Sequence, residues 1–182
     1  GTRAGSARSR LLDAAARLFY ARGVTATGID AVTAEAGVAK MSLYNNFASK
    51  DELVDAYIQA RHEEWLALYE QRVAGAESPI DGVLAVFDAY IDHASVAYDH
   101  GFRGCGLLNA AAELPVGAPG RDAVRRHKEQ VETILAQHLT AAGDDGQCDD
   151  GAVGIGHHHV DQIGRLPHHH GLRIGRHATE RG

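Results

Sequence analysis

Two short apolar patterns, one over residues 29–36 and the next over residues 41–47, constrain the fold of this chain more than any other feature. In each of them, large apolar side chains recur at the spacing of one helix face. Gly37 follows the first pattern and leaves room only for a tight turn before the second. Two short helices joined so closely predict a helix-turn-helix.

The rest of the chain predicts further helices and no strand. Apolar residues recur at helical spacing between glycine and proline interruptions, and no segment alternates as a half-buried strand would. The chain is therefore predicted to be all-α. The predicted helices cover residues 9–22, 28–36, 41–47, 50–69, 79–96, 107–114 and 121–142.

Particular residues are expected to begin or end these helices. Thr27 is a plausible N-cap of the second helix, and Ser49 with Glu52 forms a capping box for the fourth. Ser78 precedes a proline and is expected to cap the fifth helix. Gly143 is expected to end the last one.

The composition suits a globular protein. Hydrophobic residues make up 45% of the 182 and charged residues 23%, so general disorder is not expected. No apolar run approaches the length of a membrane span, and no secretory signal pattern is present, so a cytoplasmic protein without a membrane partner is expected. Cys105 and Cys148 lie far apart, which favours reduced thiols.

Charge is distributed unevenly along the chain. The net charge is −6, but residues 1–50 carry seven Lys or Arg against three acids, a balance of +4, which leaves −10 for the remainder. A basic N-terminal module on an acidic body favours local phosphate binding. A protein that coats DNA without sequence preference would need a more basic surface.

Residues 8–57 closely resemble the signature of the TetR family of transcriptional regulators. The matching motifs are Leu-Leu-Asp-Ala-Ala-Ala-Arg-Leu-Phe at 11–19 and Gly-Val-Ala-Lys-Met-Ser-Leu-Tyr-Asn-Asn-Phe at 37–47. The resemblance implies a helix-turn-helix DNA-binding domain over residues 1–50 and a helical ligand-binding domain over residues 51–143. It also implies a ligand-responsive repressor that binds a palindromic DNA operator as a homodimer, and neither an enzyme nor a cofactor protein.

The resemblance also assigns DNA contacts. A helix of two turns fits the major groove, where its exposed side chains reach base edges. The side chains expected at the groove floor are Lys40, Met41, Ser42 and Asn45, and those expected on phosphates are Thr27, Tyr44, Asn46 and Lys50. The family commonly has Ser or Thr at the position of Ala39 and His at that of Asn46. Arg3 and Arg8 are expected either to form an arm that contacts DNA or to belong to a disordered tail.

The resemblance places a small-molecule effector in the body, but it does not identify that effector. The candidate pocket residues are Trp65, Tyr69, Phe87, Tyr90, Tyr98, Phe102, Cys105, Leu108 and Asn109. Taken singly, an aromatic side chain more often belongs to the core than to a pocket, because aromatic residues supply much of the apolar area that any core needs. Cys105 is either a redox or electrophile sensor or a small residue at a tight helix junction. Asn109 and Glu113 either line a polar patch of the pocket or cap and pair locally.

The composition changes sharply after Gly143, where the family would place its dimerising helices. Residues 144–182 are rich in Gly and Asp and include histidine triplets at 157–159 and 168–170, so poor order is expected. The segment is a metal-binding tail, a solvated tail without a role, or the product of a frameshift near residues 144–150. No metal site and no catalytic site is assigned to it, although a metal carrier centred on the histidines is a rival hypothesis. The homodimer is in doubt for the same reason, and a structural domain with a vestigial helix-turn-helix is a further alternative.

Overall fold

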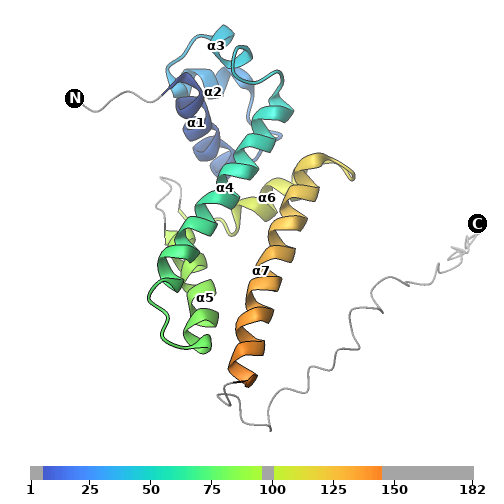
Figure 1. Ribbon diagram of the computed structural model, residues 1–182. Coiled ribbons are helices and arrows are strands. Elements are labelled where there is room, and N and C mark those ends of the chain that lie inside the picture. Colours follow the sequence, from blue (N-terminus) through green and yellow to red (C-terminus); the bar gives the residue numbers. More distant parts are fainter. Residues whose placement is uncertain (1–5, 96–100, 145–182) are drawn as a thin grey trace, which may run out of the picture. The chain divides into compact units, whose positions relative to one another are not determined.

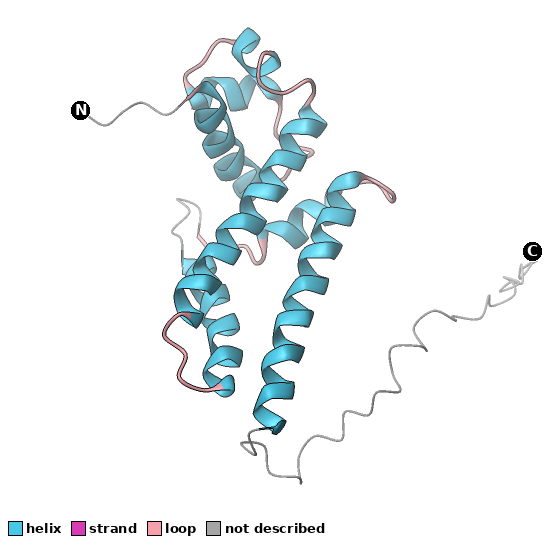
Figure 2. Ribbon diagram, in the orientation of Figure 1, coloured by secondary structure: helices cyan, strands magenta, loops and turns pink. Residues whose placement is uncertain are grey.

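The computed structural model describes residues 6–95 and 101–144, and every regular element within them is a helix (Figure 1, Figure 2). This confirms the all-α prediction. The helices are α1 (Ala7–Arg22), α2 (Ile29–Ala36), α3 (Lys40–Tyr44), α4 (Lys50–Val73), α5 (Pro79–Ser95), α6 (Gly106–Glu113) and α7 (Pro119–Asp144). The expectations for Arg3, Tyr98, Cys148 and the histidine triplets lie outside the described residues.

Helix α1 begins two residues earlier than its apolar pattern predicts. The Ser6 hydroxyl accepts a hydrogen bond from the Ser9 N–H at 3.2 Å and so caps the first turn. At the other end, the N–H of Gly23 donates to the Phe19 carbonyl, and Gly23 has φ +91°. A residue without a Cβ adopts this conformation at little cost, so the predicted glycine stop is confirmed.

The helix-turn-helix is formed by α2 and α3. Gly37 ends α2 in the left-handed conformation, with φ +60°, and its N–H donates back to the last turn of α2. The predicted cap at the other end of α2 is wrong, because Gly28 occupies the N-cap position and no side chain caps the helix. Helix α3 is also shorter than predicted. It ends at Tyr44, and the N–H groups of Asn46 and Phe47 continue the turn by donating to the Leu43 carbonyl.

The long helix α4 begins at the predicted capping box. The Ser49 hydroxyl accepts from the Glu52 N–H at 3.1 Å, and a Glu52 carboxylate oxygen accepts from the Ala48 N–H at 2.6 Å. Helix α4 then runs from the helix-turn-helix into the body, where it packs beside α5 and α7 (Figure 1).

Two clusters of buried side chains form the core. The first joins α1, α2, α3 and the start of α4 to α6 and α7, and it includes Leu11, Phe19, Leu43, Tyr57 and Leu107. The second lies between the later turns of α4, α5 and α7, around Trp65, Val86, Ala89 and Val131. Helix α6 therefore packs against the same core that orders the helix-turn-helix.

The remaining helices follow their predicted positions, with one correction. The Ser78 hydroxyl accepts from the Asp81 N–H at 3.2 Å and donates to the Asp81 carboxylate at 2.8 Å, as expected for an N-cap. Gly143 does not end α7, because the helix continues through it to Asp144. Among the described helices, none is long and apolar enough to cross a membrane.

Candidate functional site

Helix α3 exposes the polar and flexible side chains of its outer face. Met41 is 67% exposed and Tyr44 is 47% exposed, and Lys40 and Asn45 are also on the surface. On the opposite side Leu43 is fully buried in the first core. The side chains predicted for the groove floor are therefore presented outward from an anchored helix, although Ser42 is only partly exposed.

Lys40 is held by an acid of the preceding helix. Its ammonium group lies 2.7 Å from the Asp30 carboxylate, and the hydrogen bond and charge of Asp30 raise the pKa of Lys40. Both side chains are well exposed, so Lys40 can exchange Asp30 for another anion at little cost in free energy. The Lys40 side chain, at the start of α3, is thus positioned by Asp30 but remains free to move.

Asn46 is turned back onto its own helix. Its side-chain amide donates to the Ser42 carbonyl at 2.7 Å, and its backbone carbonyl accepts from the Arg8 guanidinium at 3.0 Å. Arg8 also lies over the Phe47 ring, 4.4 Å from the ring centroid. Arg8 is therefore part of α1 and fastens the turn after α3, and both the loose arm and the disordered tail are wrong for this residue.

Thr27 does not present its side chain to a phosphate, contrary to the expectation. It is 1% exposed, and its hydroxyl donates to the Gly23 carbonyl at 2.7 Å. This short polar side chain joins the end of α1 to the loop before α2, which explains why a threonine suits the position. Lys50, in contrast, is partly exposed in the first turn of α4.

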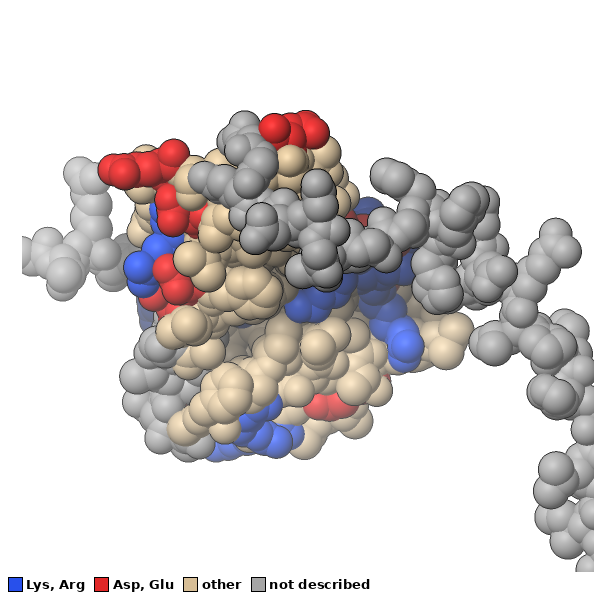
Figure 3. Space-filling model, turned by 90° about the horizontal axis from the view of Figure 1, so that it is seen from below, with Lys and Arg blue, Asp and Glu red and all other residues tan. Residues whose placement is uncertain are grey.

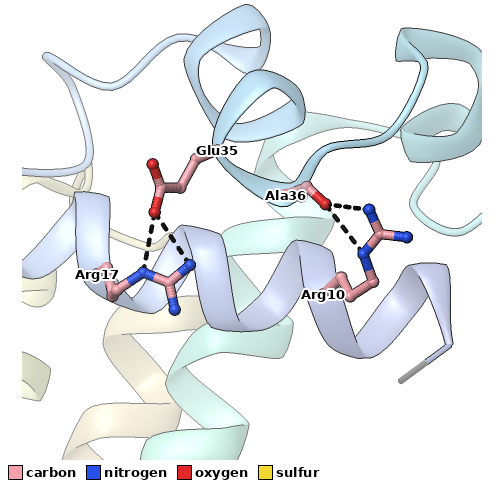
Figure 4. Close-up of polar contacts among 4 residues, drawn as sticks. All are labelled: Arg10, Arg17, Glu35 and Ala36. Atoms are coloured by element: carbon pink, nitrogen blue, oxygen red, sulfur yellow. Dashed lines mark hydrogen bonds and ion pairs between the residues drawn. The ribbon is translucent and has the colours of Figure 1, made fainter. Parts of the chain in front are cut away.

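Two arginines of α1 hold the turn between α2 and α3, a role that the sequence analysis missed. Figure 4 shows Arg10 directed at the Ala36 carbonyl, which accepts from its Nε at 3.0 Å and its Nη2 at 2.6 Å. Arg17 pairs with Glu35 of α2 at 3.0 Å (Figure 4). The two arginines are seven residues apart and so share one face of α1, which is the signal that could have indicated a common partner.

A cavity of about 190 Å³ lies between the end of α1, α4, α5 and the segment that leads into α6. Of the predicted pocket residues, Tyr90, Phe102 and Cys105 line it. The sequence analysis missed several of the remaining wall residues, namely Tyr20, Arg61, His93, Ala94, Gly104 and Gly106. Tyr20 was missed because it belongs to α1, which the sequence assigned entirely to the DNA-binding domain.

The other predicted pocket residues that the structure describes do not line this cavity. Trp65 is fully buried in the second core, stacked on Tyr69 with 5.7 Å between ring centroids. Phe87 and Leu108 are about half exposed on the surface. The Asn109 amide donates to the Arg103 carbonyl at 2.8 Å, which favours the local capping alternative for this residue. Helical periodicity gives the inward face of a helix but not which inward side chains border a void.

The polar edge of the cavity is formed by side chains of α4 and α5. A Glu64 carboxylate oxygen lies 2.7 Å from the Arg61 guanidinium and 3.1 Å from the His93 imidazole. Burial acts to raise the pKa of Glu64, but these two partners lower it on balance. The hydroxyl of Tyr90, another lining residue, accepts from the Lys128 ammonium at 2.9 Å and lies 3.5 Å from the His127 Nε2.

The segment leading into α6 is fastened to the end of α1. The Tyr20 hydroxyl accepts from the Arg103 N–H at 2.5 Å and donates to the Gly104 carbonyl at 3.2 Å, and the Arg103 side chain donates to the Ala21 carbonyl. Tyr20 and Gly104 also line the cavity. The cavity wall is thus continuous with the last turn of α1.

Glu113 makes a second connection, between α6 and the loop after α1. Its carboxylate accepts from the Thr25 N–H at 2.7 Å. Burial acts to raise the pKa of Glu113, but the hydrogen bonds from Thr25 and Val24 and the charge of Lys50 lower it on balance. Glu113 therefore neither lines the cavity nor pairs locally, so both expected roles are wrong, and it joins the body to the helix-turn-helix instead.

A buried histidine pair joins α4 to α7 near the cavity. His127 is 2% exposed, and its Nδ1 lies 2.9 Å from the Nδ1 of His62. Burial, followed by the nearby charges of Lys128, His62 and His93, lowers the pKa of His127 to about 4. Since one nitrogen must donate and the other accept, one of the two rings must be unprotonated at Nδ1.

Elsewhere on the surface, charges of both signs are mixed. Seen from the end remote from α1 to α3, uncharged side chains predominate, with separate groups of acidic and of basic side chains among them (Figure 3). Within residues 6–95 and 101–144, no group of three or more His, Cys, Asp or Glu side chains could hold a metal ion. Cys105 is a free thiol, partly buried immediately before α6.

Comparisons with known proteins agree with this geometry. The family model described as bacterial regulatory proteins, tetR family, matches residues 11–57. The repressor KstR2 of Mycobacterium tuberculosis is 34% identical over 84 residues, which are 46% of this chain and 42% of that protein. The regulator TcmR of Streptomyces glaucescens is 31% identical over 135 residues, which are 74% of this chain and 59% of that protein. The chain thus spans about half the length of these curated relatives.

The chain covers a larger share of one solved structure than of these curated relatives. A TetR-family transcriptional regulator from Streptomyces coelicolor is 35% identical, has a TM-score of 0.69, and aligns with 76% of this chain and 72% of its own. These relatives are named as regulators, in agreement with the expectation that the chain is not an enzyme. Sequence, helix order and the matched helix-turn-helix together identify the chain as a member of the TetR family of bacterial regulatory proteins.

Proposed function

We propose that this protein is a transcriptional repressor that binds a palindromic operator through α3 and releases it in response to a small molecule. The observation that carries the proposal is the exposed face of α3, with Met41 and Tyr44 outward and Leu43 anchored in the core. The relative KstR2 is named as a repressor, which supports repression over activation for this chain. The division into a DNA-binding domain over residues 1–50, a ligand-binding domain over 51–143 and a tail over 144–182 belongs to this proposal, as does a cytoplasmic location.

The proposed DNA contacts follow from exposure. Met41 and Asn45 read base edges in the major groove, while Tyr44 and Lys50 contact phosphates on either side. Lys40 contributes after it exchanges Asp30 for DNA, because its ion pair is exposed. Asn46 has a smaller role in this proposal, since its side-chain amide donates to the Ser42 backbone carbonyl, and Ser42 has a smaller role because it is only partly exposed.

The proposed effector site is the 190 Å³ cavity. Tyr20 lines it and is bonded to the Arg103–Gly104 backbone, so a ligand there bears directly on the end of α1. A displacement of α6 by the ligand also reaches the loop after α1, because Glu113 of α6 accepts a hydrogen bond from that loop. An effector that prefers one arrangement of these contacts would change the position of α3 and weaken operator binding.

The operator-bound form is proposed to be a homodimer, because a palindrome offers two equal half-sites. Helix α5 supports this with a stripe of exposed apolar side chains on one face, Leu84, Phe87 and Ile91. A contiguous apolar stripe on a surface marks an interface. Sedimentation equilibrium of the full chain should give a dimer that Phe87→Glu weakens and the loop variant Val116→Glu does not. A monomer at every concentration would contradict this part of the proposal.

The function is tested by selection of genomic DNA fragments with the purified chain at two salt concentrations. The wild-type protein should select particular fragments and lose affinity steeply with salt, because phosphate contacts release counterions. The Tyr44→Ala/Lys50→Ala double variant should lose this selection. Arg125→Ala, which removes an exposed arginine of α7, should retain it. No specific selection by the wild-type chain would contradict the proposal.

A further inference from the structure

Helix α3 is too short to fix its own orientation. It has five residues, its N-cap residue Ala39 makes no side-chain cap, and Leu43 is the side chain that it buries. A helix of one or two turns is marginal by itself, because few hydrogen bonds offset the entropy lost on ordering the chain. The direction in which α3 presents Met41 and Tyr44 therefore depends on contacts that its flanking segments make with other helices.

Arg10 of α1 holds the segment that enters α3. The Ala36 carbonyl accepts from its Nε at 3.0 Å and from its Nη2 at 2.6 Å (Figure 4), and the Gly37 carbonyl accepts from the same Nη2 at 2.5 Å. These carbonyls lie at the C-terminal end of α2, where a helix leaves its last acceptors without intrahelical donors. Gly37 also leaves room for the guanidinium, because a Cβ there would lie 3.0 Å from Nη2.

Arg8 of α1 holds the segment that leaves α3. Its Nη1 donates to the Asn46 carbonyl at 3.0 Å, and its guanidinium lies over the Phe47 ring, 4.4 Å from the ring centroid. Phe47 is 1% exposed, so the ring that carries this contact is itself fixed in the core. Arg8 and Arg10 are two residues apart, so their side chains leave α1 in different directions and reach opposite ends of α3.

The angle of α3 matters more for base contacts than for phosphate contacts. A side chain distinguishes bases only when it reaches the base edges with the right geometry, whereas contacts to phosphate carry no sequence information. A change in the angle of α3 would displace Met41 and Asn45 from the base edges. Such a change should therefore reduce the preference for one sequence over another more than it reduces the binding of DNA in general.

We propose that Arg8 and Arg10 are positioning residues for operator recognition. They hold the two ends of α3 at the angle that brings Met41 and Asn45 to base edges, and they do so without contacting DNA. This inference rests on the proposed reading of DNA by α3 and adds the residues that determine its specificity. Arg10 acts by joining two carbonyl groups, and Arg8 acts by one hydrogen bond and its position over the Phe47 ring.

The first test compares a selected operator fragment with random DNA. Arg8→Gln and Arg10→Gln should each lower the preference for the operator by about tenfold, the equivalent of one mismatched base pair. Neither should change the slope of log K against log salt, because no phosphate contact is lost. Arg22→Gln removes an exposed arginine from the other end of α1 and is the matched control, which should change neither quantity. An unchanged preference, or a slope reduced by about one, would overturn the proposal for that residue.

Lysine variants separate geometry from charge. Arg10→Lys keeps the charge but lacks the planar guanidinium that joins the Ala36 and Gly37 carbonyls, so the preference should stay low. Arg8→Lys keeps one donor and a cation over the Phe47 ring, so it should restore most of the preference. Full rescue by Arg10→Lys would show that charge alone suffices and overturn the proposal for Arg10. If Arg10→Gln does not fold, as judged by circular dichroism, Arg10→Lys decides for that position.

Hydrogen exchange of the DNA-free chain separates this inference from the proposed function. The Val38 N–H closes the end of α2 and the Phe47 N–H closes the end of α3. The Val38 amide should exchange about tenfold faster in Arg10→Gln, and the Phe47 amide should do so in Arg8→Gln, the factor for one hydrogen bond to a charged group. Unchanged exchange overturns the inference and leaves the repressor function standing. Faster exchange, in a chain that selects no specific DNA, supports the holding of α3 by these arginines and contradicts the repressor function.

Discussion

At the scale of single residues, the proposed DNA interface divides into side chains that read sequence and side chains that hold phosphate. Met41 is the most exposed large apolar side chain of α3. An apolar contact in the major groove distinguishes thymine from the other bases by its methyl group. Lys50 lies in the first turn of α4, where a charge acts on the backbone of any sequence. Substitutions of these two residues should therefore change DNA binding in different ways.

Lys50→Ala should weaken binding to operator and random DNA alike and reduce the slope of log K against log salt by about one. Met41→Ala should leave the slope unchanged and reduce the preference for operator over random DNA. Fluorescence anisotropy over a salt series with both DNAs measures the two quantities. A change of slope in Met41→Ala would indicate that Met41 contacts the DNA backbone and not a base.

Two glycines in equally exposed places should respond oppositely to alanine. Gly37 has φ +60°, so Gly37→Ala should destabilise the fold by about 1 kcal/mol. Gly143 is helical and has open space around its α-carbon, so Gly143→Ala should stabilise it by about 0.5 kcal/mol. Urea unfolding monitored by circular dichroism gives both values. Equal effects of the two changes would contradict the conformational argument.

At the scale of helices, the contact between α4 and α7 depends on protonation. The pKa of His127 is lowered to about 4, against about 6.5 for an unfolded histidine. Well above pH 6.5, the His127 imidazole is neutral in both the folded and the unfolded chain, so the free energy of unfolding has its full value. As the pH falls toward 4, only the unfolded chain takes up the proton, so the free energy of unfolding should drop by roughly 3 kcal/mol at most.

Urea unfolding between pH 7.5 and pH 4.5 should show this loss in the wild-type protein. His127→Gln should be less stable at pH 7.5 and should show a flatter pH dependence. His138→Gln changes a histidine of the same helix that bonds to Tyr69 at 2.8 Å, and it serves as the control. If His127→Gln and the wild-type protein lose stability in parallel, the lowered pKa is not the cause.

At the scale of the whole molecule, Glu113 ties the body to the DNA-binding helices. Glu113→Ala keeps α6, since alanine is a good helix former, but removes the acceptor for the Thr25 N–H. Hydrogen exchange at Thr25 should become faster, and an effector should cause a smaller loss of operator affinity than in the wild-type protein. Glu132→Ala, an exposed substitution on α7, should change neither quantity. An unchanged effector response in Glu113→Ala would exclude this contact as a route of coupling.

The sequence by itself determined the helices and the family. Apolar spacing, the Ser49 cap and the stops at Gly23 and Gly37 are local signals, because each depends on residues within one or two turns. The exposed face of α3 followed from the family resemblance instead, since the apolar pattern over residues 41–47 includes Met41 and Tyr44, which are exposed. These predictions needed no knowledge of which helices meet.

Only the tertiary structure decided which side chains border the cavity and which connect the body to the end of α1 and the loop after it. Tyr20 lies 84 residues from Gly104 in the chain and Thr25 lies 88 residues from Glu113, yet both pairs are hydrogen-bonded. Trp65 was misassigned for the same reason, since a periodic pattern shows that a side chain faces inward but not what it meets there. Thr27 was assigned to a phosphate by the resemblance, whereas its buried hydroxyl donates to the Gly23 carbonyl. Contacts between residues far apart in sequence are set by how complete helices pack, and that information is not local.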